Sequence, residues 1–506
     1  MSAEYFDVVI VGGGLSGIGA ACHLERNCPG KTYTILEGRD SIGGTWDLFR
    51  YPGVRSDSDM HTLGYSFKPW TEAKAIADGP SILKYIKQTA TDYDVEKHIR
   101  LQHRVESASW SEADSHWEVT ARKGEGGESV QVRGRYILMC AGYYNYTEGF
   151  TPEFEGRDDF QGEIIHPQHW PEDVDYTDKR IVVIGSGATA MTLVPSLSDK
   201  AAHVVMLQRS PTYVASAPDV DVIANFLRKV LPERWAYSVT RWKNINMQQF
   251  LYRRTRTSPA KVRKALLERT QKALGEEYDI DPHFTPRYDP WDQRLCLIPN
   301  GDLFEAIRKD RVSVVTEKLD RFTEDGILLA NGEEIEADII VTATGLNLSV
   351  FGDVQFYSDG KRIDVSKSVS YKGLMCTELP NVVCTFGYIN ASWTLRSDLI
   401  AEYFCRLIRY MDEKGVKRVV PKISEEERSA STHPWIQDFS AGYIERGIDL
   451  YPRQGSRAPW INPQDYKRDR VMFMQSSLED GVLEFGGGET ATGVGEDKLP
   501  PYEAAG

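Results

Sequence analysis

The sequence predicts an α/β fold with two Rossmann-like dinucleotide-binding domains and a helical insertion in the second domain. Two observations point to this fold directly. An apolar run at residues 6–11 and another at residues 180–184 are each followed at once by a glycine-rich turn. The third observation is length, since 506 residues are too many for one hydrophobic core and suggest two or three domains.

The first glycine-rich turn has the residues expected around a nucleotide pyrophosphate. In this motif the first glycine makes a tight turn, the second lets the backbone approach the phosphates, and a helix N-terminus faces the anion. Glu37 ends the next apolar run, where a carboxylate accepts hydrogen bonds from a ribose and would repel a 2′-phosphate. The unit therefore predicts FAD. Its turn residues are Gly12, Gly14, Ser16 and Gly17.

The second turn differs from the first in the residue that closes the unit. Its next apolar run, residues 203–207, leads to Arg209 and Ser210 instead of an acid. Because a permanently charged arginine favours a 2′-phosphate, this unit predicts NADPH. Both turns have the strand and helix context that the mechanism requires, which makes two incidental glycine turns a poor alternative. The turn residues are Gly185, Ser186, Gly187, Ala188 and Thr189.

Composition restricts the class of protein. Contents of 41% hydrophobic and 26% charged residues are those of an ordinary soluble globular chain. No run approaches the roughly 20 apolar residues of a membrane span, and the first strand begins by Phe6, so we expect a cytoplasmic protein without a signal peptide. The net charge of -14 argues against nucleic-acid binding. Seven cysteines without a CxxC motif support neither a disulfide framework nor a zinc site, so reduced, mostly buried cysteines are expected.

One segment departs from this acidic balance. Residues 222–275 hold thirteen Lys and Arg against Glu233 and Glu268, a local charge of +11. Apolar residues recur there at helical spacing, which predicts a helical insertion. A solvated basic face packed on an acidic body is the main interpretation, and contact with an anionic membrane surface or partner is the alternative.

The domain organisation follows from these units. Apolar strands at 136–142 and 337–345 end in small residues and are expected to cross between the nucleotide domains. We expect a helix over 397–414 and a mobile tail in the last thirty residues, which have little to bury. The predicted FAD domain comprises residues 1–146 and 347–506, and the NADPH domain residues 147–346 with its insertion at about 213–292.

Several classes of enzyme use both a flavin and NADPH, among them disulfide reductases and monooxygenases. Disulfide reductases need a close cysteine pair near the flavin, but Cys22 and Cys28 lie in and after the first helix, away from the expected flavin ring. The segment 160–171 resembles the fingerprint FxGxxxHTxxWP of flavin-dependent Baeyer–Villiger monooxygenases. It matches at Phe160, Gly162, His166, Trp170 and Pro171, and it departs by having Pro167 where threonine is usual.

The resemblance extends over nearly the whole chain. Segments 43–46, 50–53, 56–59 and 290–296 are similar to a subgroup that includes an ethionamide-activating monooxygenase. We expect His166 to be a linker residue bonded to backbone instead of a proton-transfer base. Flavin-containing monooxygenases that oxygenate nitrogen or sulfur share the first half of the fingerprint but usually end it in Tyr or Phe.

The resemblance implies roles for particular residues. It places the backbone of Val105 against the FAD adenine, and Arg55 and Ser56 against the bound NADP. It implies NADPH-dependent reduction of FAD, formation of a flavin C4a-peroxide with O2, and conversion of a ketone to an ester or lactone, with sulfoxidation of thioethers as a side activity. It places along the flavin Thr45, Trp46 and Asp47, and near the isoalloxazine Asp57.

Arg294 occupies the family's active-site arginine position. A cation that cannot give its proton away suits a peroxide anion and a developing alkoxide. The resemblance therefore implies Arg294 and Asp57 as the catalytic pair, with Asp57 orienting the guanidinium. Many family members have lysine before this arginine where this chain has Gln293, which leaves Arg209 with more of the coenzyme discrimination. An N- or S-oxygenating monooxygenase and a silent flavin-binding or membrane-surface scaffold remain the alternatives.

Overall fold

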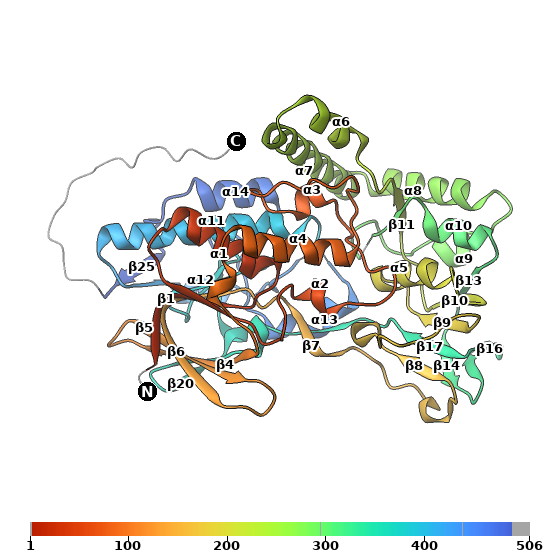
Figure 1. Ribbon diagram of the computed structural model, residues 1–506, viewed down its shortest axis with the longest axis horizontal. Helices are drawn as coiled ribbons and strands as arrows, with labels where there is room; N and C mark the ends of the chain where they lie inside the picture. The colour runs from red at the N-terminus through yellow and green to blue at the C-terminus, as the bar shows by residue number, and fades with distance from the viewer. Residues whose placement is uncertain (1–2, 294, 438, 488–506) are drawn as a thin grey trace.

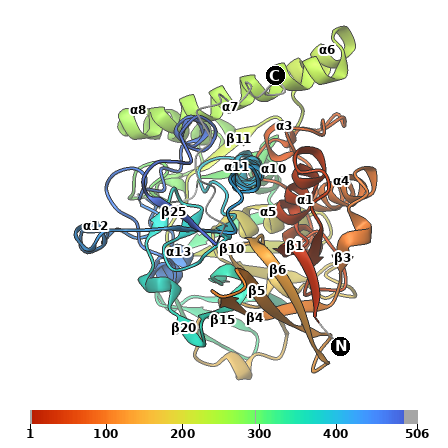
Figure 2. The ribbon, with the colours of Figure 1, turned by 90° about the vertical axis from the view of Figure 1, so that its left-hand side faces the viewer.

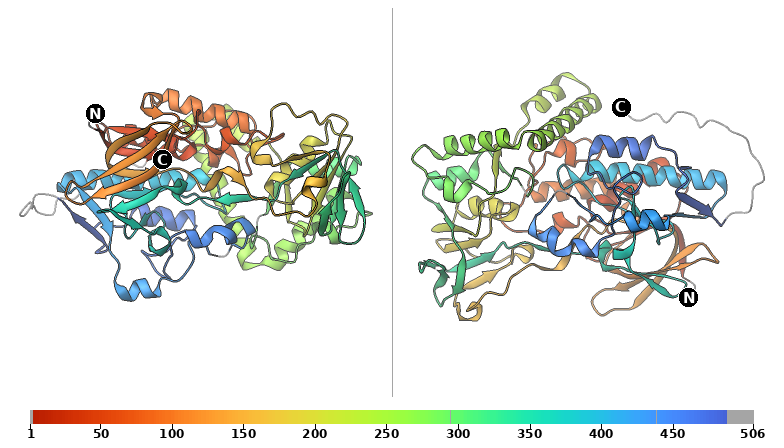
Figure 3. Two further views of the ribbon diagram at one scale, coloured as in Figure 1. Left: turned by 90° about the horizontal axis from the view of Figure 1, so that it is seen from below. Right: turned by 180° about the vertical axis from the view of Figure 1, so that it is seen from behind.

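The computed structural model describes residues 3–293, 295–437 and 439–487, and its two large sheets lie side by side (Figures 1 and 3). A nine-stranded sheet defines a first domain and a five-stranded sheet a second domain. Each is built around a parallel β-strand, turn and helix unit of the kind that the glycine-rich turns predict, so the predicted α/β fold is confirmed. The exact domain bounds stay a prediction.

The nine-stranded sheet combines parallel and antiparallel parts. Its parallel part has β1 between β2 and β6, with β23 added beside β6. Its antiparallel part runs from β6 through β5 to β4, and the edge hairpin of β19 and β20 joins β4 through a parallel pairing of β19. The strands are β1 (Glu4–Val11), β2 (Tyr33–Leu36), β3 (Ile99–Arg100), β4 (His103–Ser111), β5 (His116–Lys123), β6 (Ser129–Met139), β19 (Gln355–Ser358), β20 (Lys361–Ile363) and β23 (Val382–Cys384).

Helices from both ends of the chain cover one face of this sheet (Figure 1). The first helix, α1 (Leu15–Asn27), packs along α11 (Trp393–Lys414) and touches α4 (Gly79–Asp92). Ten successive residues of α1 are buried, because the helix lies between the sheet and α11. The helix α11 begins at Trp393, four residues before the predicted start at 397, since its N-cap is Ser392.

The five-stranded sheet is parallel throughout. Its strand order is β13-β10-β9-β17-β8, which places β9 and its glycine-rich turn near the middle. Helices α5 (Ala188–Leu197) and α10 (Asp302–Arg308) pack beside it. The strands are β8 (Glu163–Ile165), β9 (Arg180–Ile184), β10 (His203–Gln208), β13 (Val312–Thr316) and β17 (Ile339–Thr342), and a separate antiparallel sheet holds β14 (Leu319–Phe322), β15 (Gly326–Leu329) and β16 (Glu334–Glu336).

The chain passes between the two domains along one pair of strands. After β6 it continues as β7 (Tyr144–Gly149), and after β17 it returns as β18 (Leu346–Leu348). These two strands pair antiparallel with each other. The apolar strands predicted as crossings therefore lead into a shared two-stranded connection.

The predicted helical insertion is confirmed. It leaves the second domain after β11 (Val214–Ala217) and returns at β12 (Cys296–Pro299), and these strands pair in parallel. Its long helices lie along one side of the molecule (Figure 2). They are α6 (Val222–Val230), α7 (Glu233–Thr257) and α8 (Pro259–Leu274), followed by the short α9 (Asp281–Phe284). Within the described residues, no helix is long and apolar enough to cross a membrane.

The C-terminal segment corrects one expectation. The strand β25 (Leu483–Gly486) pairs antiparallel with β24 (Arg418–Pro421), so the start of the segment predicted to be mobile is part of a sheet. Leu483 is buried, which supplies the apolar contact that the glycine-rich composition concealed. The rest of that predicted tail, residues 488–506, lies outside the described residues. Further C-terminal helices are α12 (Glu425–Ala430), α13 (Gly442–Gly447) and α14 (Tyr466–Met474).

Candidate active site

A cavity of about 530 Å³ lies where the two domains meet. Both glycine-rich turns contribute to its walls, through Gly12 and Gly14 on one side and Ala188 and Thr189 on the other. Other walls come from segments 43–58, 140–147, 295–297 and 388–393. The sequence-predicted residues that line the cavity are Gly12, Gly14, Ser16, Glu37, Thr45, Trp46, Arg55, Ser56, Asp57, Val105, Ala188 and Thr189.

Glycines at the first turn are required by close backbone approach. Gly12 has φ +104°, and a Cβ there would lie 2.6 Å from the carbonyl oxygen of Cys140. Gly17 does not line the cavity, but a Cβ on it would lie 1.9 Å from the Gly12 carbonyl oxygen, so it lets α1 pack against the turn. Gly14 precedes the first turn of α1, which holds no acid and no capping side chain. The α1 N-terminus is therefore open to an anion from the cavity.

The Glu37 carboxylate is fixed by backbone donors at the edge of the cavity. Gly13 N–H donates to its Oε2 at 2.7 Å, and Arg39 N–H donates to its Oε1 at 2.8 Å. Burial raises the pKa of Glu37 above its ordinary value, although the two backbone donors act to lower it. Each carboxylate oxygen can still accept another hydrogen bond. The arrangement fits a pair of ribose hydroxyls.

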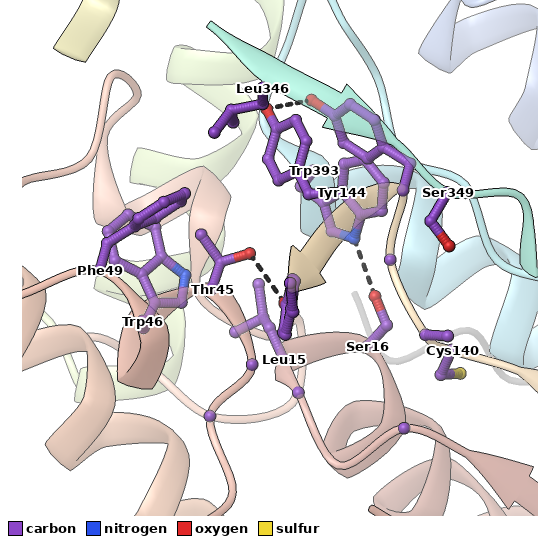
Figure 4. A pocket seen from close by; sticks show the side chains of 18 of the residues that line it. Leu15, Ser16, Thr45, Trp46, Phe49, Cys140, Tyr144, Leu346, Ser349 and Trp393 are labelled. Atoms are coloured by element: carbon purple, nitrogen blue, oxygen red, sulfur yellow. Dashed lines mark hydrogen bonds between the residues drawn. The ribbon is translucent and has the colours of Figure 1, made fainter. Parts of the chain in front are cut away.

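A second glycine pair completes the nucleotide cradle. Gly43 and Gly44 have positive φ and lie against the first turn, with Gly43 N–H donating to the Gly13 carbonyl at 3.0 Å. The short helix α2 (Thr45–Leu48) starts there, and its Thr45 hydroxyl lies 3.3 Å from the Tyr146 hydroxyl (Figure 4). Thr45 and Trp46 line the cavity, and their implied place along the flavin stays a prediction.

Asp47 is bonded to an arginine of the cavity wall, and its implied place along the flavin stays a prediction. It is buried below the cavity wall and is not one of the lining residues. Its carboxylate accepts from Arg39 Nη2 at 2.7 Å, and Arg39 itself lines the cavity. Arg39 Nε is buried without a hydrogen-bond partner, which is a donor available to a bound phosphate or ribose. Asp47 thus positions a cationic wall residue.

The second glycine-rich turn is more open than the first. Gly185 has φ +136°, and a Cβ there would lie 2.3 Å from the Ala343 carbonyl oxygen, so this turn also requires glycine. Gly187 caps α5, where a Cβ would meet nothing within 4 Å. Room therefore exists above the α5 N-terminus for a second pyrophosphate.

Several residues of the predicted NADPH site do not line the cavity. They are Gly185, Ser186, Gly187, Arg209 and Ser210. Ser186 donates its hydroxyl to the Ser210 carbonyl at 3.2 Å, which ties the turn to the end of β10. Arg209 and Ser210 are exposed just beyond that end. This is the carboxyl edge of a parallel sheet, where the motif places the 2′ position of the ribose.

Arg55 offers direct structural support for an anionic ligand. Its Nη1 pairs with the Asp302 carboxylate at 2.5 Å, whereas its Nη2 is buried without a hydrogen-bond partner. A buried guanidinium nitrogen left unpaired is costly unless a ligand supplies an acceptor. Ser56 is also buried and accepts from the Ala77 N–H at 3.3 Å. Arg55 therefore fits a phosphate of the second nucleotide.

Arg294 lies outside the described residues. The residues that follow it, Leu295, Cys296 and Leu297, line the cavity, and so does Asp57. Val105 lies on β4 and lines the cavity together with His103 and Arg104.

Sequence reasoning missed an aromatic wall. Tyr143 stacks on Trp393 with ring centroids 5.2 Å apart and an interplanar angle of 13°. The Tyr143 and Tyr144 hydroxyls lie 2.6 Å apart, and Trp393 Nε1–H donates to the Ser16 hydroxyl at 2.8 Å (Figure 4). These side chains give the cavity an aromatic wall. The segment Tyr143-Tyr144-Asn145-Tyr146, directly after the crossing, was the available signal.

His166 joins the two crossing strands, as expected of a linker residue. Its Nε2 lies 3.2 Å from the Gly345 carbonyl oxygen, and its Nδ1 accepts from Gln168 N–H at 3.2 Å. Burial lowers its pKa, which favours the neutral tautomer that makes both bonds. Gly149 packs on the ring so closely that a Cβ would lie 1.9 Å from His166 Cε1. His166 is not a cavity-lining residue.

The site therefore has two nucleotide cradles that open into one cavity with an aromatic wall. Within the described residues no cluster of His, Cys, Asp or Glu could hold a metal ion. All seven cysteines are buried and unbonded to one another, and only Cys140 and Cys296 reach the cavity. This combination defines the class of two-nucleotide flavoprotein oxidoreductases.

Comparisons with known proteins identify the family. The flavin-binding monooxygenase-like family matches residues 6–422. The chain is 52% identical over 483 residues to the FAD-containing monooxygenase EthA of Mycolicibacterium smegmatis, which covers 95% of this chain and 97% of the relative. The chain belongs to the flavin-binding monooxygenase-like family and is an FAD-dependent monooxygenase.

Solved structures show the same fold. An oxidised steroid monooxygenase bound to NADP superposes with a TM-score of 0.76 at 23% identity, over 96% of this chain and all of that one. Cyclohexanone monooxygenase from Rhodococcus sp. Phi1 bound to NADP+ gives a TM-score of 0.74 at 21% identity, over 96% and 100% of the two chains.

Proposed function

We propose that this protein is an NADPH- and O2-dependent Baeyer–Villiger monooxygenase that converts ketones to esters or lactones, with oxidation of thioethers as a side activity. The observation that carries the proposal is the single cavity shared by both nucleotide cradles and by the segment that follows Arg294. The fingerprint ending in Trp170 and Pro171 favours this branch over N- or S-oxygenating relatives.

The chain's own residues suit the binding of FAD at the first cradle. The α1 N-terminus and the backbone after Gly12 face the position of a pyrophosphate, and Glu37 faces that of a ribose. Val105 lies at the adenine end, while Thr45 and Trp46 extend along the flavin. Bound FAD, once reduced by NADPH, supplies the activation of O2 for transfer of one oxygen atom.

The second cradle suits NADPH. In this proposal the backbone of residues 185–189 holds its pyrophosphate, and Arg55 and Ser56 contact the coenzyme between the two domains. Arg209, with Ser210, binds the 2′-phosphate from the carboxyl edge of the second sheet. Gln293 stands where relatives have a second cation, so Arg209 carries most of the preference for NADPH over NADH. A cytoplasmic location fits both the supply of NADPH and the buried, reduced cysteines.

Arg294 is the proposed electrophilic residue. Its permanent charge would polarise the substrate carbonyl and stabilise negative charge that develops on oxygen during the transfer. Asp57, which also lines the cavity, would orient the guanidinium. The rings of Tyr143 and Trp393 keep water from the reacting atoms, so the charges interact in a medium of low dielectric constant.

The identity of the flavin is tested first. Flavin released by heat and separated by chromatography should be FAD, because Glu37 suits an adenosine ribose that FMN lacks. Recovery of FMN alone would contradict the first cradle's assignment.

The reaction type is tested with Arg294→Ala and the matched variant Arg287→Ala, an exposed arginine on the same segment. Arg294→Ala should keep its FAD and lose ester formation by about a hundredfold to a thousandfold, since one preorganised donor is removed. Products from linear, cyclic and aryl ketones and one thioether are identified by mass spectrometry under labelled O2, with flavin reduction followed separately by stopped flow. An Arg294→Ala enzyme with wild-type ester yield per NADPH would favour an N- or S-oxygenase instead.

A further inference from the structure

The insertion carries an unusual concentration of exposed apolar side chains. Eleven of the fifteen large hydrophobic residues that are exposed in the described part of the chain lie on α6, α7 and the turn between them. The largest are aromatic, with Phe226 62%, Trp235 69% and Trp242 68% exposed. We call this set the α6–α7 face; it comprises Val222, Ile223, Phe226, Val230, Leu231, Trp235, Val239, Trp242, Met247, Phe250 and Leu251.

Helical periodicity gathers much of this set into one stripe. On α7 the exposed Trp235, Val239, Trp242 and Phe250 recur at intervals that return to the same side of the helix. The buried residues of α7, such as Tyr237 and Thr240, fall on the opposite side. One side of α7 therefore packs on the rest of the protein, whereas the opposite side carries the exposed apolar residues.

Polar bonds on the inner side fix how α7 is oriented. Arg241 Nη1 donates to the carbonyl oxygens of His61 at 3.0 Å and Gly64 at 2.7 Å. Gln248 Nε2 donates to the Asp59 carboxylate at 2.8 Å. Because these bonds tie the inner side to the first domain, α7 cannot turn its outer stripe inward without breaking them. The fold therefore leaves the residues of the stripe exposed.

Positive charge accompanies the apolar stripe. Residues 222–275 carry a charge of +11 in a chain whose net charge is -14. Lys243 and Arg241 are paired with Asp221 and Asp398 on the inner side. Exposed basic residues of the insertion include Lys229, Arg234, Arg253, Arg254, Lys261, Lys264 and Arg269. Aromatic and aliphatic residues flanked by Lys and Arg are the pattern of helices that lie in a membrane interface.

We propose that the α6–α7 face binds the surface of an anionic lipid bilayer, with its aromatic and aliphatic side chains in the headgroup region and its basic residues against lipid phosphates. A second copy of the chain is the other occupant that an apolar face could take. Symmetric pairing would set two faces of the same positive sign against each other, which opposes a dimer through this face. An anionic surface complements the charge, and α6, α7 and α8 follow one another along one side of the molecule (Figure 2).

The test measures flotation of the holoenzyme with vesicles of phosphatidylglycerol and phosphatidylcholine, and with vesicles of phosphatidylcholine alone. The apolar variant replaces Phe226, Trp235 and Trp242 with serine. Its matched control replaces Tyr5, Leu101 and Leu450 with serine, three exposed apolar residues outside the insertion. The charge variant replaces Lys229, Arg234, Arg253 and Arg254 with glutamine.

Wild type and control should float with the anionic vesicles and should release as salt is raised. Partition should fall about tenfold or more in the apolar variant, and about fivefold for each basic residue replaced in the charge variant. FAD content and NADPH oxidation should be unchanged in all of them, which verifies folding.

Two results would overturn the proposal. One is failure of the wild type to float with anionic vesicles, or equal flotation of the apolar variant and its control. The other is a wild-type dimer by light scattering that becomes monomeric in the apolar variant, because the face would then join two copies of the chain.

Discussion

Glu37→Gln is expected to weaken FAD binding without unfolding the protein. The carboxylate receives the N–H groups of Gly13 and Arg39, one on each oxygen. An amide keeps the shape but places an NH2 group where one oxygen was. The NH2 group therefore faces one of the two backbone N–H donors, with which it cannot form a hydrogen bond. The ribose also loses one of the oxygen atoms that could accept its hydroxyl hydrogen.

The size of the effect follows from that single lost bond. A hydrogen bond to a charged group contributes about 1.5–3 kcal/mol, which corresponds to roughly 10- to 150-fold in a dissociation constant. The purified Glu37→Gln protein should thus contain less flavin than the wild type. It should regain its yellow colour and its thermal stability when FAD is added.

The assay is titration of apoprotein with FAD, followed by quenching of flavin fluorescence. Glu402→Gln is the matched control, since burial also raises the pKa of Glu402 but this residue does not line the cavity. Its FAD dissociation constant should equal that of the wild type. If Glu37→Gln binds FAD as tightly as Glu402→Gln does, the carboxylate does not hold the ribose and the first cradle has been assigned incorrectly.

Two further predictions concern the coenzyme and the insertion. Arg209→Ala should raise KM for NADPH by about one to two orders of magnitude and leave KM for NADH nearly unchanged, whereas the exposed Arg321→Ala in the same domain should change neither; equal losses for both coenzymes would place Arg209 elsewhere. Burial would raise the pKa of Asp398, but the hydrogen bond and charge of His23 and the charge of Arg241 outweigh it and hold the pKa below its ordinary value. Asp398 therefore stabilises the fold fully above its unfolded pKa, and this contribution disappears as pH falls through the lowered folded value. Asp398→Asn should cost about 3–5 kcal/mol in urea unfolding at pH 7, with a difference from wild type that shrinks below about pH 4; a difference independent of pH would refute the assignment.

The fold and the first cradle could be predicted because their signals are local. Gly12, Gly17 and Glu37 lie within one strand, helix and strand unit, and the contacts of Gly17 and Glu37 are made inside that unit. The start of β2 at Tyr33 and the end of β9 at Ile184 also match their apolar runs. A short-range pattern is sufficient where the chain meets only its own neighbours.

The rest of the site depends on contacts between distant segments, which a single sequence does not display. Trp393 reaches Ser16 across 377 positions of the chain, so the aromatic wall could not be assembled from spacing. Asp47 is adjacent in sequence to a lining residue but turns toward Arg39. The outer stripe of α7 has the same helical periodicity as a buried stripe, and only the structure shows which side contacts the body.

The insertion belongs to the second domain by sequence, yet it is anchored to the first. Tyr237 donates its hydroxyl to the Tyr65 carbonyl at 2.8 Å, and Arg241 reaches Asp398 on α11. The strands at its two ends, β11 and β12, remain with the second domain. Its later helices α8 and α9 pack on the second domain, against α10 and β13. The insertion is therefore a strap across the junction, and a rotation of one sheet against the other would have to bend it between β11 and α6 and between α7 and α8.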